Sequence, residues 1–151
     1  MIYVDSSVLL ADLLAEPRSP PDTLWDEDLA SSRLLTYEVW NRINAYGLII
    51  SHGSRARGLL ARVNLTEMSD AALARALEPF PVAVRTLDAL HLATMEFLRN
   101  QGESVTLASY DSRLLAVAQA LGISAALLTV ARIVKPLALI RHRGGPMFRL
   151  A

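Results

Sequence analysis

Short apolar segments alternate with amphipathic segments along most of the chain. The apolar segments are a few residues long, which is typical of strands that are buried on both faces of a sheet. We expect strands at Ile2–Val4, Arg33–Thr36, Val63–Met68 and Val105–Ala108, and a fifth within Ile123–Val130. Parallel strands that alternate with helices are joined by right-handed crossovers. The pattern therefore predicts an α/β fold with a parallel sheet covered by helices on both faces.

The amphipathic segments between these strands predict helices. Their apolar side chains recur at intervals of three and four residues, which places them on one helix face. The expected helices cover Val8–Ala15, Asp22–Leu29, Tyr37–Ile50, Arg55–Arg62, Ala71–Leu77, Leu87 to a stop signal at Asn100–Gly102, and Ser112–Leu121. We expect Thr36, Ser54 and Thr86 to cap three of them, because a hydroxyl oxygen accepts hydrogen bonds from the free N–H groups of a first turn.

The composition limits the class of protein and of site. A chain of 151 residues suits one domain, and its 52 % hydrophobic content excludes a disordered chain. There is no cysteine, which excludes disulfides, zinc–thiolate sites and a cysteine nucleophile together. Any metal site in this chain must therefore use oxygen or imidazole ligands.

The ends of the sequence lack membrane and export signals. The chain opens directly into an apolar, strand-like run, without a basic leader or a cleavage site. The longest apolar run, Ile123–Ile140, contains Arg132, Lys135 and Pro136, so it is a poor membrane span. We expect a soluble, cytoplasmic protein with no membrane partner.

Charge is balanced in total but uneven along the chain. The net charge is zero, which argues against a polyanion bound over the whole surface. The first 30 residues hold seven acids against Arg18 alone, whereas the segment from Ser112 onward holds six basic residues and no acid. One face of such a molecule can still hold phosphates.

Four acids occupy equivalent places relative to the expected elements. Asp5 ends the first strand and Asp111 follows the fourth, while Glu38 and Asp88 fall in the opening turns of helices. In an open parallel α/β sheet, these strand ends and helix starts lie along one edge, where ligands bind. We therefore expect the four carboxylates to share one crevice.

Such a crevice predicts a metal site. Several carboxylates repel one another unless a cation neutralises them. Oxygen ligands without cysteine or paired histidines favour a hard ion, Mg²⁺ or Mn²⁺. One or two such ions activate a water and stabilise a phosphate during an in-line displacement. The pattern thus indicates hydrolysis of phosphodiester bonds.

The four acids lie within short segments that carry a family resemblance. The segments are MIYVDSSVLL (1–10), TYEV (36–39), RTLDALHLA (85–93) and SYDSRLL (109–115). In this order and spacing they resemble the PIN domains, in particular the VapC-type toxins, over roughly Met1 to Ile123. The resemblance implies a three-layer α/β/α domain with a short five-stranded parallel sheet, and cleavage of RNA that depends on Mg²⁺ or Mn²⁺. It also implies a homodimer and a cognate antitoxin that blocks the site.

The resemblance also assigns residues. Asp5, Glu38, Asp88 and Asp111 match the acidic quartet of the family, which holds the metal and carries the catalysis. The metal-activated water would attack an RNA phosphodiester within this quartet.

Four further polar residues are candidates at the same site. Ser6 and Ser109 match hydroxyl residues of the family and are expected to hydrogen-bond a metal ligand or a phosphate, although turn chemistry explains them almost as well. Arg42 and His91 each follow one of the acids by about one helical turn. Both are candidates to approach phosphate, with an ion-pair arginine and a packed histidine as the structural alternatives.

The resemblance ends before the chain does. We place the PIN-like nuclease domain at residues 1–129 and a basic C-terminal extension, not a separate domain, at 130–151. RNA binding, contact with a dimer partner and disorder stay open for that extension.

Two other functions fit part of the pattern. A PIN-like module that binds RNA or protein without cleaving keeps the fold, but it has no need of four carboxylates. A phosphoacceptor receiver domain also places acids at strand ends around Mg²⁺, and Lys135–Pro136 is similar to its lysine–proline element. Receivers carry an acidic pair after the first strand, where this chain has Ser6–Ser7. The sequence favours the ribonuclease and leaves its RNA target and the number of ions open.

Overall fold

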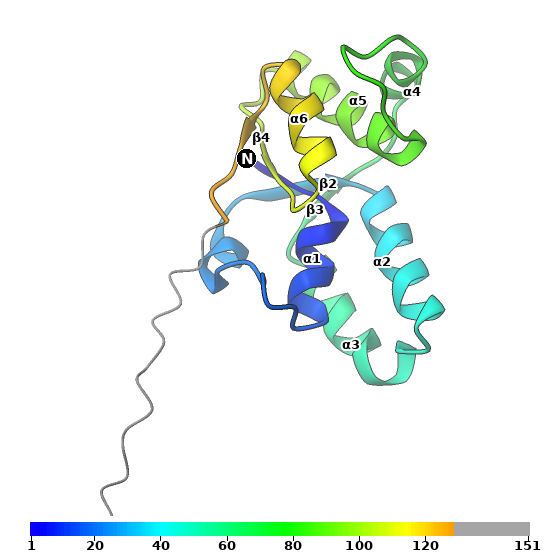
Figure 1. Cartoon of the computed structure of the whole chain (residues 1–151), viewed down its shortest axis with the longest axis vertical. Coiled ribbons are helices and arrows are strands. Elements are labelled where there is room, and N and C mark those ends of the chain that lie inside the picture. Colours follow the sequence, from blue (N-terminus) through cyan, green and yellow to red (C-terminus); the bar gives the residue numbers. More distant parts are fainter. Residues whose placement is uncertain (129–151) are drawn as a thin grey trace, which may run out of the picture.

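Five parallel strands form one sheet in the computed structural model, which describes residues 1–128 (Figure 1). The strands are β1 (Ile2–Val4), β2 (Leu29–Ser32), β3 (Asn64–Thr66), β4 (Thr106–Ala108) and β5 (Ser124–Ala125). Their order across the sheet is β3-β2-β1-β4-β5, with every pair parallel. The expected α/β fold with a five-stranded parallel sheet is confirmed.

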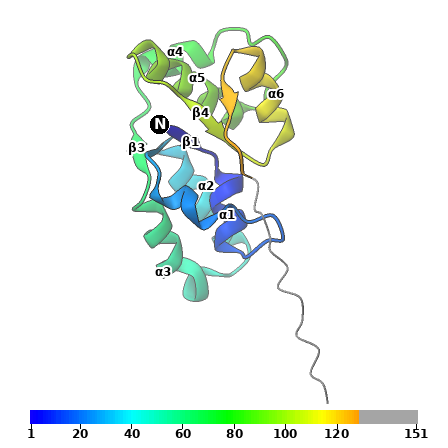
Figure 2. The ribbon, with the colours of Figure 1, turned by 90° about the vertical axis from the view of Figure 1, so that its left-hand side faces the viewer.

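The helices lie in two layers on opposite faces of this sheet, as Figures 1 and 2 show. The helices α1 (Ser6–Leu13), α2 (Leu34–Ala45) and α3 (Ile49–Leu60) form one layer, and α4 (Asp70–Ala76), α5 (Thr86–Asn100) and α6 (Ser112–Ala120) form the other. Successive strand residues point to opposite faces. Val4 accordingly belongs to the core beneath α1 and α2, whereas Tyr3 belongs to the core beneath α5 and α6.

The strand order places a crevice beside the central strand. From β1 the chain proceeds to β2 and β3 on one side, and it then crosses to β4 and β5 on the other. Ligands of open parallel sheets bind at the carboxyl ends of the strands, where the order reverses. Here that point lies between the ends of β1 and β4, which are followed by Asp5 and by Ser109–Asp111.

The second strand is displaced from its expected place. It spans Leu29–Ser32, and the segment Arg33–Thr36 that was expected to form it instead begins α2. Ser31 and Ser32 are completely buried, and the Ser31 hydroxyl donates to the Val4 carbonyl oxygen at 2.8 Å. A strand that contains buried, hydrogen-bonded serines has no continuous apolar pattern, so the sequence favours the neighbouring leucines as the strand instead.

The expected helix over Tyr37–Ile50 is also wrong, because it is two helices. Gly47 breaks it with a φ of 66°, a left-handed conformation that glycine adopts without strain. The segment after the break starts α3 at Ile49, so Ser54 lies inside a helix and caps nothing. Because α2 already begins at Leu34, Glu38 stands in its second turn rather than at its start.

Other boundaries differ by less. The first helix begins at Ser6 rather than Val8, and Thr86 is the first residue of α5 rather than its cap. The segment Asp22–Asp26 is a 3₁₀ turn that ends before Leu29 enters β2. Within residues 1–128, no helix is long and apolar enough to cross a membrane. The basic extension at 130–151 and its boundary at residue 129 lie outside the described residues.

Candidate active site

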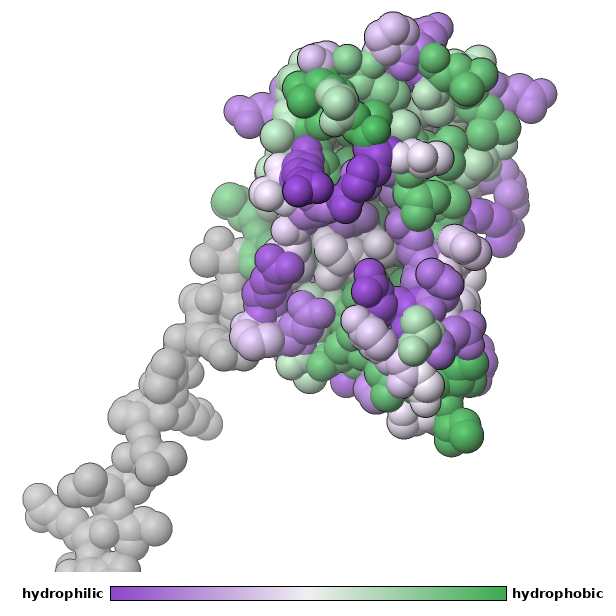
Figure 3. Space-filling view, turned by 45° about the vertical axis from the view of Figure 1, so that its right-hand side comes forward, coloured by the Kyte–Doolittle hydropathy of each residue, from purple (hydrophilic) through white to green (hydrophobic). Residues whose placement is uncertain are grey.

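All four expected acids border one hollow at the carboxyl edge of the sheet. Its volume is about 380 Å³, and its lining residues come from both helix layers. Besides the four acids, its lining comprises Ser6, Ser7, Leu10, Arg42, Arg85, Thr86 and Leu87. Figure 3 shows hydrophilic side chains gathered above and below the middle of this side of the molecule. The crevice expected from the strand order is therefore present, and charged and hydroxyl side chains line it together with Leu10 and Leu87.

Asp5 is held rigidly between β1 and α1. Its carboxylate caps α1, with Oδ2 accepting from the Ser7 backbone N–H at 3.3 Å. The same oxygen accepts from the Ser7 hydroxyl at 2.5 Å and from the Ser109 hydroxyl at 2.9 Å. Among the described residues, Oδ1 accepts no hydrogen bond. One oxygen of this buried carboxylate thus fixes its orientation, and the other remains free to bind a ligand.

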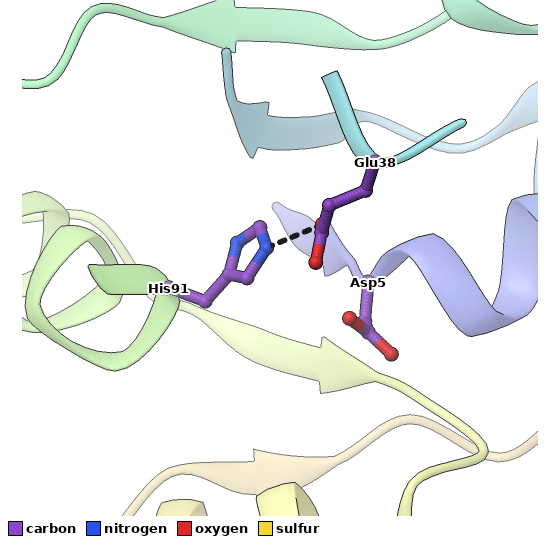
Figure 4. Close-up of side chains that lie close together, drawn as sticks. All are labelled: Asp5, Glu38 and His91. Carbon is purple, nitrogen blue, oxygen red and sulfur yellow. Dashed lines mark hydrogen bonds and ion pairs between the residues drawn. The ribbon is translucent and has the colours of Figure 1, made fainter. Parts of the chain in front are cut away.

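Glu38 meets His91 across the edge of the sheet, as Figure 4 shows. The His91 Nε2–H donates to Glu38 Oε2 at 2.8 Å, although the two residues come from helices of opposite layers. His91 is only 1 % exposed, and its Nδ1 lies 2.8 Å from the Tyr3 hydroxyl. The Tyr3 oxygen in turn accepts from the Ser32 backbone N–H at 3.1 Å. A buried chain of hydrogen bonds therefore runs from β2 through His91 to Glu38.

These contacts decide what His91 can do at the site. Burial lowers the pKa of His91, but the nearby Tyr3 phenol and the Glu38 carboxylate outweigh it and raise this pKa to about 10. The ring Nε2 carries the hydrogen that Glu38 accepts, so it has no lone pair to offer a metal. His91 lies where it orients Glu38, away from solvent and from any approaching phosphate.

Asp88 and Asp111 form the opposite wall of the hollow, joined by Arg85. The Arg85 Nε donates to Asp88 Oδ2 at 2.9 Å, and its Nη2 donates to Asp111 Oδ2. Asp111 also caps α6, where its Oδ1 accepts from the backbone N–H groups of Arg113 at 2.8 Å and Leu114 at 3.4 Å. Partial burial raises the pKa of Asp111, but these N–H donors and the guanidinium outweigh it and lower this pKa below its ordinary range.

The quartet consequently divides into two pairs. Among the described residues, one group of three potential ligands lies with its atoms within 4.8 Å of one another, namely Asp5, Glu38 and His91. Asp88 and Asp111 border the same hollow but do not join this group. The four acids thus border one crevice, and within it Asp5 and Glu38 form the pair that lies with His91 in the close group.

The remaining candidates are placed unequally. Ser109 contacts Asp5 directly, as expected, whereas Ser6 borders the hollow without a side-chain hydrogen bond among the described residues. Arg42 also borders the hollow, and its guanidinium lies 5.7 Å from the centre of the Tyr46 ring. Arg42 therefore has its charge at the rim of the site.

The donor set fits a hard divalent ion. Glu38 Oε1, like Asp5 Oδ1, accepts no hydrogen bond from the described residues, and both residues belong to the close group. Carboxylate oxygens are the ligands that Mg²⁺ and Mn²⁺ prefer. The side of the hollow that Asp5 and Glu38 line can thus bind such an ion without breaking an existing contact.

Four residues of the site are not among those predicted from the sequence. Ser7 has a weak sequence signal, because a hydroxyl two residues after a capping acid is well placed to hydrogen-bond that acid. Arg85 stands three residues before Asp88, a spacing that predicts an ion pair on a helix. Tyr3 and Ser32 carry no such signal, since their contacts with His91 join segments far apart in the chain.

Comparisons with known proteins agree with this geometry. The family model described as "PIN domain" matches residues 2–120. The chain is 30 % identical over 129 residues to Ribonuclease VapC47 of Mycobacterium tuberculosis (strain CDC 1551 / Oshkosh), which covers 81 % of this chain and 93 % of that protein. Among solved structures, a chain of the "Toxin-antitoxin complex from Klebsiella pneumoniae" has a similar fold, with a TM-score of 0.55 and 20 % identity over 77 % of this chain and 91 % of that one.

Proposed function

Because the chain belongs to the PIN-domain family, among its VapC-type members, we propose that it is a metal-dependent endoribonuclease and the toxin of a toxin–antitoxin pair. One observation carries the proposal. Four carboxylates border a single hollow, and two of them, Asp5 and Glu38, offer ligand atoms within 4.8 Å of one another. Each of the two also keeps one oxygen without a hydrogen bond from the described residues. A non-cleaving module would have no need of such an arrangement.

Each residue then has a part in the reaction. Asp5 and Glu38 would hold Mg²⁺ or Mn²⁺, which supplies an activated water and neutralises phosphate charge when bound. Ser7 and Ser109 hold the Asp5 carboxylate in place.

The other wall of the hollow would position the RNA. Asp88 and Asp111 border the hollow on that wall and would orient the attacking water and the leaving oxygen. Arg42 and the Ser6 hydroxyl lie at the rim, where a phosphate of the strand can contact them.

Cleavage of RNA by matched variants tests the proposal. The purified, ion-free chain is incubated with a labelled RNA pool, with Mg²⁺ or with EDTA. We expect products with Mg²⁺ only, and their loss in Asp5→Asn. An equivalent substitution at Asp26, an exposed acid outside the hollow, should leave cleavage unchanged. Cleavage in EDTA, or full activity of Asp5→Asn, would refute the proposal; RNA binding without products would favour the non-cleaving module.

We extend the proposal to partners and location. The similar fold from the Klebsiella complex supports a cognate antitoxin, and the family supports a homodimer that acts on RNA in the cytoplasm. Co-expression with the product of an adjacent small reading frame should relieve growth arrest and yield a stable complex on size-exclusion chromatography. Undiminished growth arrest, with no complex, would argue against that partner.

A further inference from the structure

We propose that the hollow takes one divalent ion, on the Asp5–Glu38 side, and that Arg85 supplies the second positive charge, across Asp88 and Asp111. The inference rests on the proposed function, because it concerns the ion which that function requires. It assigns to Arg85 the place that a second metal would take in a two-ion site.

The two walls of the hollow differ in how many of their carboxylate oxygens are free. On one side, Asp5 Oδ1 and Glu38 Oε1 accept no hydrogen bond from the described residues. On the other side, both oxygens of Asp111 are occupied, Oδ1 by backbone N–H groups of α6 and Oδ2 by Arg85. Asp88 Oδ2 is also occupied by Arg85. Among the described residues only Asp88 Oδ1 accepts no hydrogen bond on this wall, so a second ion would find three of the four carboxylate oxygens already in use.

The positive charge of Arg85 already serves the wall formed by Asp88 and Asp111. Arg85 contacts two carboxylates at once with its Nε and Nη2, so a single guanidinium balances the repulsion between them. Guanidinium does not lose its proton in proteins, so this balance holds at every working pH. A divalent ion at Asp88 and Asp111 would have to compete with two charge-assisted hydrogen bonds and lie beside a fixed positive charge.

On the Asp5–Glu38 wall, the basic side chain beside the acids is His91. His91 also contacts an acid of the site, but it engages Glu38 Oε2 alone and makes no hydrogen bond with Asp5. Unlike Arg85, it therefore leaves a free oxygen on each of the two carboxylates. The two walls differ in this respect, and the difference predicts where the ion binds.

Arg85 lies near a second arginine, Arg113, which does not line the hollow of the four acids. The Arg85 side chain is 58 % exposed at the border of the hollow, and it also lines an adjacent hollow of about 220 Å³ together with Arg113. Arg113 makes no side-chain ion pair among the described residues. The two arginines thus share a surface, but Arg85 alone bridges the acids. This makes Arg113 the matched control.

Counting bound Mn²⁺ tests the inference without any RNA. The ion-free full chain is titrated with Mn²⁺, followed by calorimetry and by the loss of the free-Mn²⁺ electron paramagnetic resonance signal. We expect one ion per chain for the wild type and for Arg113→Gln, and two for Arg85→Gln. Two ions in the wild type, or one ion in a folded Arg85→Gln, would overturn the inference.

Two further variants keep the test decisive. Should Arg85→Gln fail to fold, as judged by circular dichroism, the wild-type count still decides, and Asp5→Asn should lose the single ion. Retention of that ion by Asp5→Asn would place it on the wrong wall and overturn the inference. Arg85→Lys keeps the positive charge and should bind one ion; a second ion there would count against the role of charge.

The inference and the proposed function fail in different ways. A wild type that cleaves RNA with Mg²⁺ yet binds two ions keeps its function and loses the single-ion arrangement. A wild type that binds no Mn²⁺ at all loses both, because the function itself requires the ion.

Discussion

Replacing His91 tests whether a buried hydrogen bond orients Glu38 for the ion. His91→Gln and His91→Asn form a matched pair. A glutamine amide reaches about as far as Nε2, the atom that donates to Glu38, whereas an asparagine amide reaches only as far as Nδ1. Glutamine should therefore restore the contact with Glu38, and asparagine should not.

The expected size of the effect follows from the contact that is lost. The Nε2–H donates to a carboxylate at 2.8 Å, and a hydrogen bond to a charged group contributes about 1.5–3 kcal/mol. At about 1.4 kcal/mol for each tenfold change, asparagine should weaken the binding of Mn²⁺ by about 10–100-fold. Glutamine should weaken it by less than about tenfold.

Titration of the ion-free variants with Mn²⁺ measures this difference. Circular dichroism and thermal unfolding are recorded alongside, because His91→Gln loses the contact between Nδ1 and Tyr3, whereas the asparagine amide still reaches that position. Tyr3→Phe removes that contact and the hydrogen bond from the Ser32 backbone N–H, but it leaves the bond between His91 and Glu38, so it should lower stability more than ion affinity. If folded His91→Asn binds Mn²⁺ as tightly as the wild type, or if glutamine and asparagine behave alike, His91 does not position Glu38.

Two further predictions concern stability. In EDTA, burial lowers the pKa of His91, but Tyr3 and Glu38 outweigh it and raise this pKa from its ordinary value of 6.5 to about 10. The stabilising effect of the protonated ring is therefore fully present below about pH 6.5 and is lost as the pH rises towards 10. The difference in free energy of unfolding between the wild type and His91→Gln should narrow over that range; a constant difference would contradict the assignment. Gly47→Ala places a side chain on a residue in the left-handed conformation and should lower the free energy of unfolding by about 1–2 kcal/mol. Gly58 lies inside α3, where an added Cβ meets no atom within 4 Å, so Gly58→Ala should raise the free energy of unfolding by about 0.5–1 kcal/mol. Thermal unfolding should show these opposite shifts; equal shifts would contradict the conformational argument.

Much of the fold could be predicted from the sequence, because the alternation of strands and helices is strong and parallel crossovers leave few topologies. The second strand could not, because its buried serines interrupt the apolar pattern. The break at Gly47 was missed for a different reason. A glycine within an amphipathic run does not by itself show whether the helix continues, and only the left-handed backbone settles the matter.

The sequence predicts which edge of the sheet holds the candidate site, but not which side chains pair with one another there. Acids after parallel strands and near helix starts must lie along one edge, so their shared hollow follows from topology. Which side chains meet across that hollow depends on contacts between distant segments. The pairing of Glu38 with His91 joins opposite helix layers, and Arg85 reaches Asp111 from another helix. Spacing along the chain contains no information about such contacts.

Anomalous diffraction from a crystal soaked in Mn²⁺ tests the central claim most directly. We predict one strong anomalous peak in the hollow, bound by one carboxylate oxygen each of Asp5 and Glu38. A peak bound only by Asp88 and Asp111, or a hollow without any peak at an Mn²⁺ concentration that supports RNA cleavage, would contradict the account.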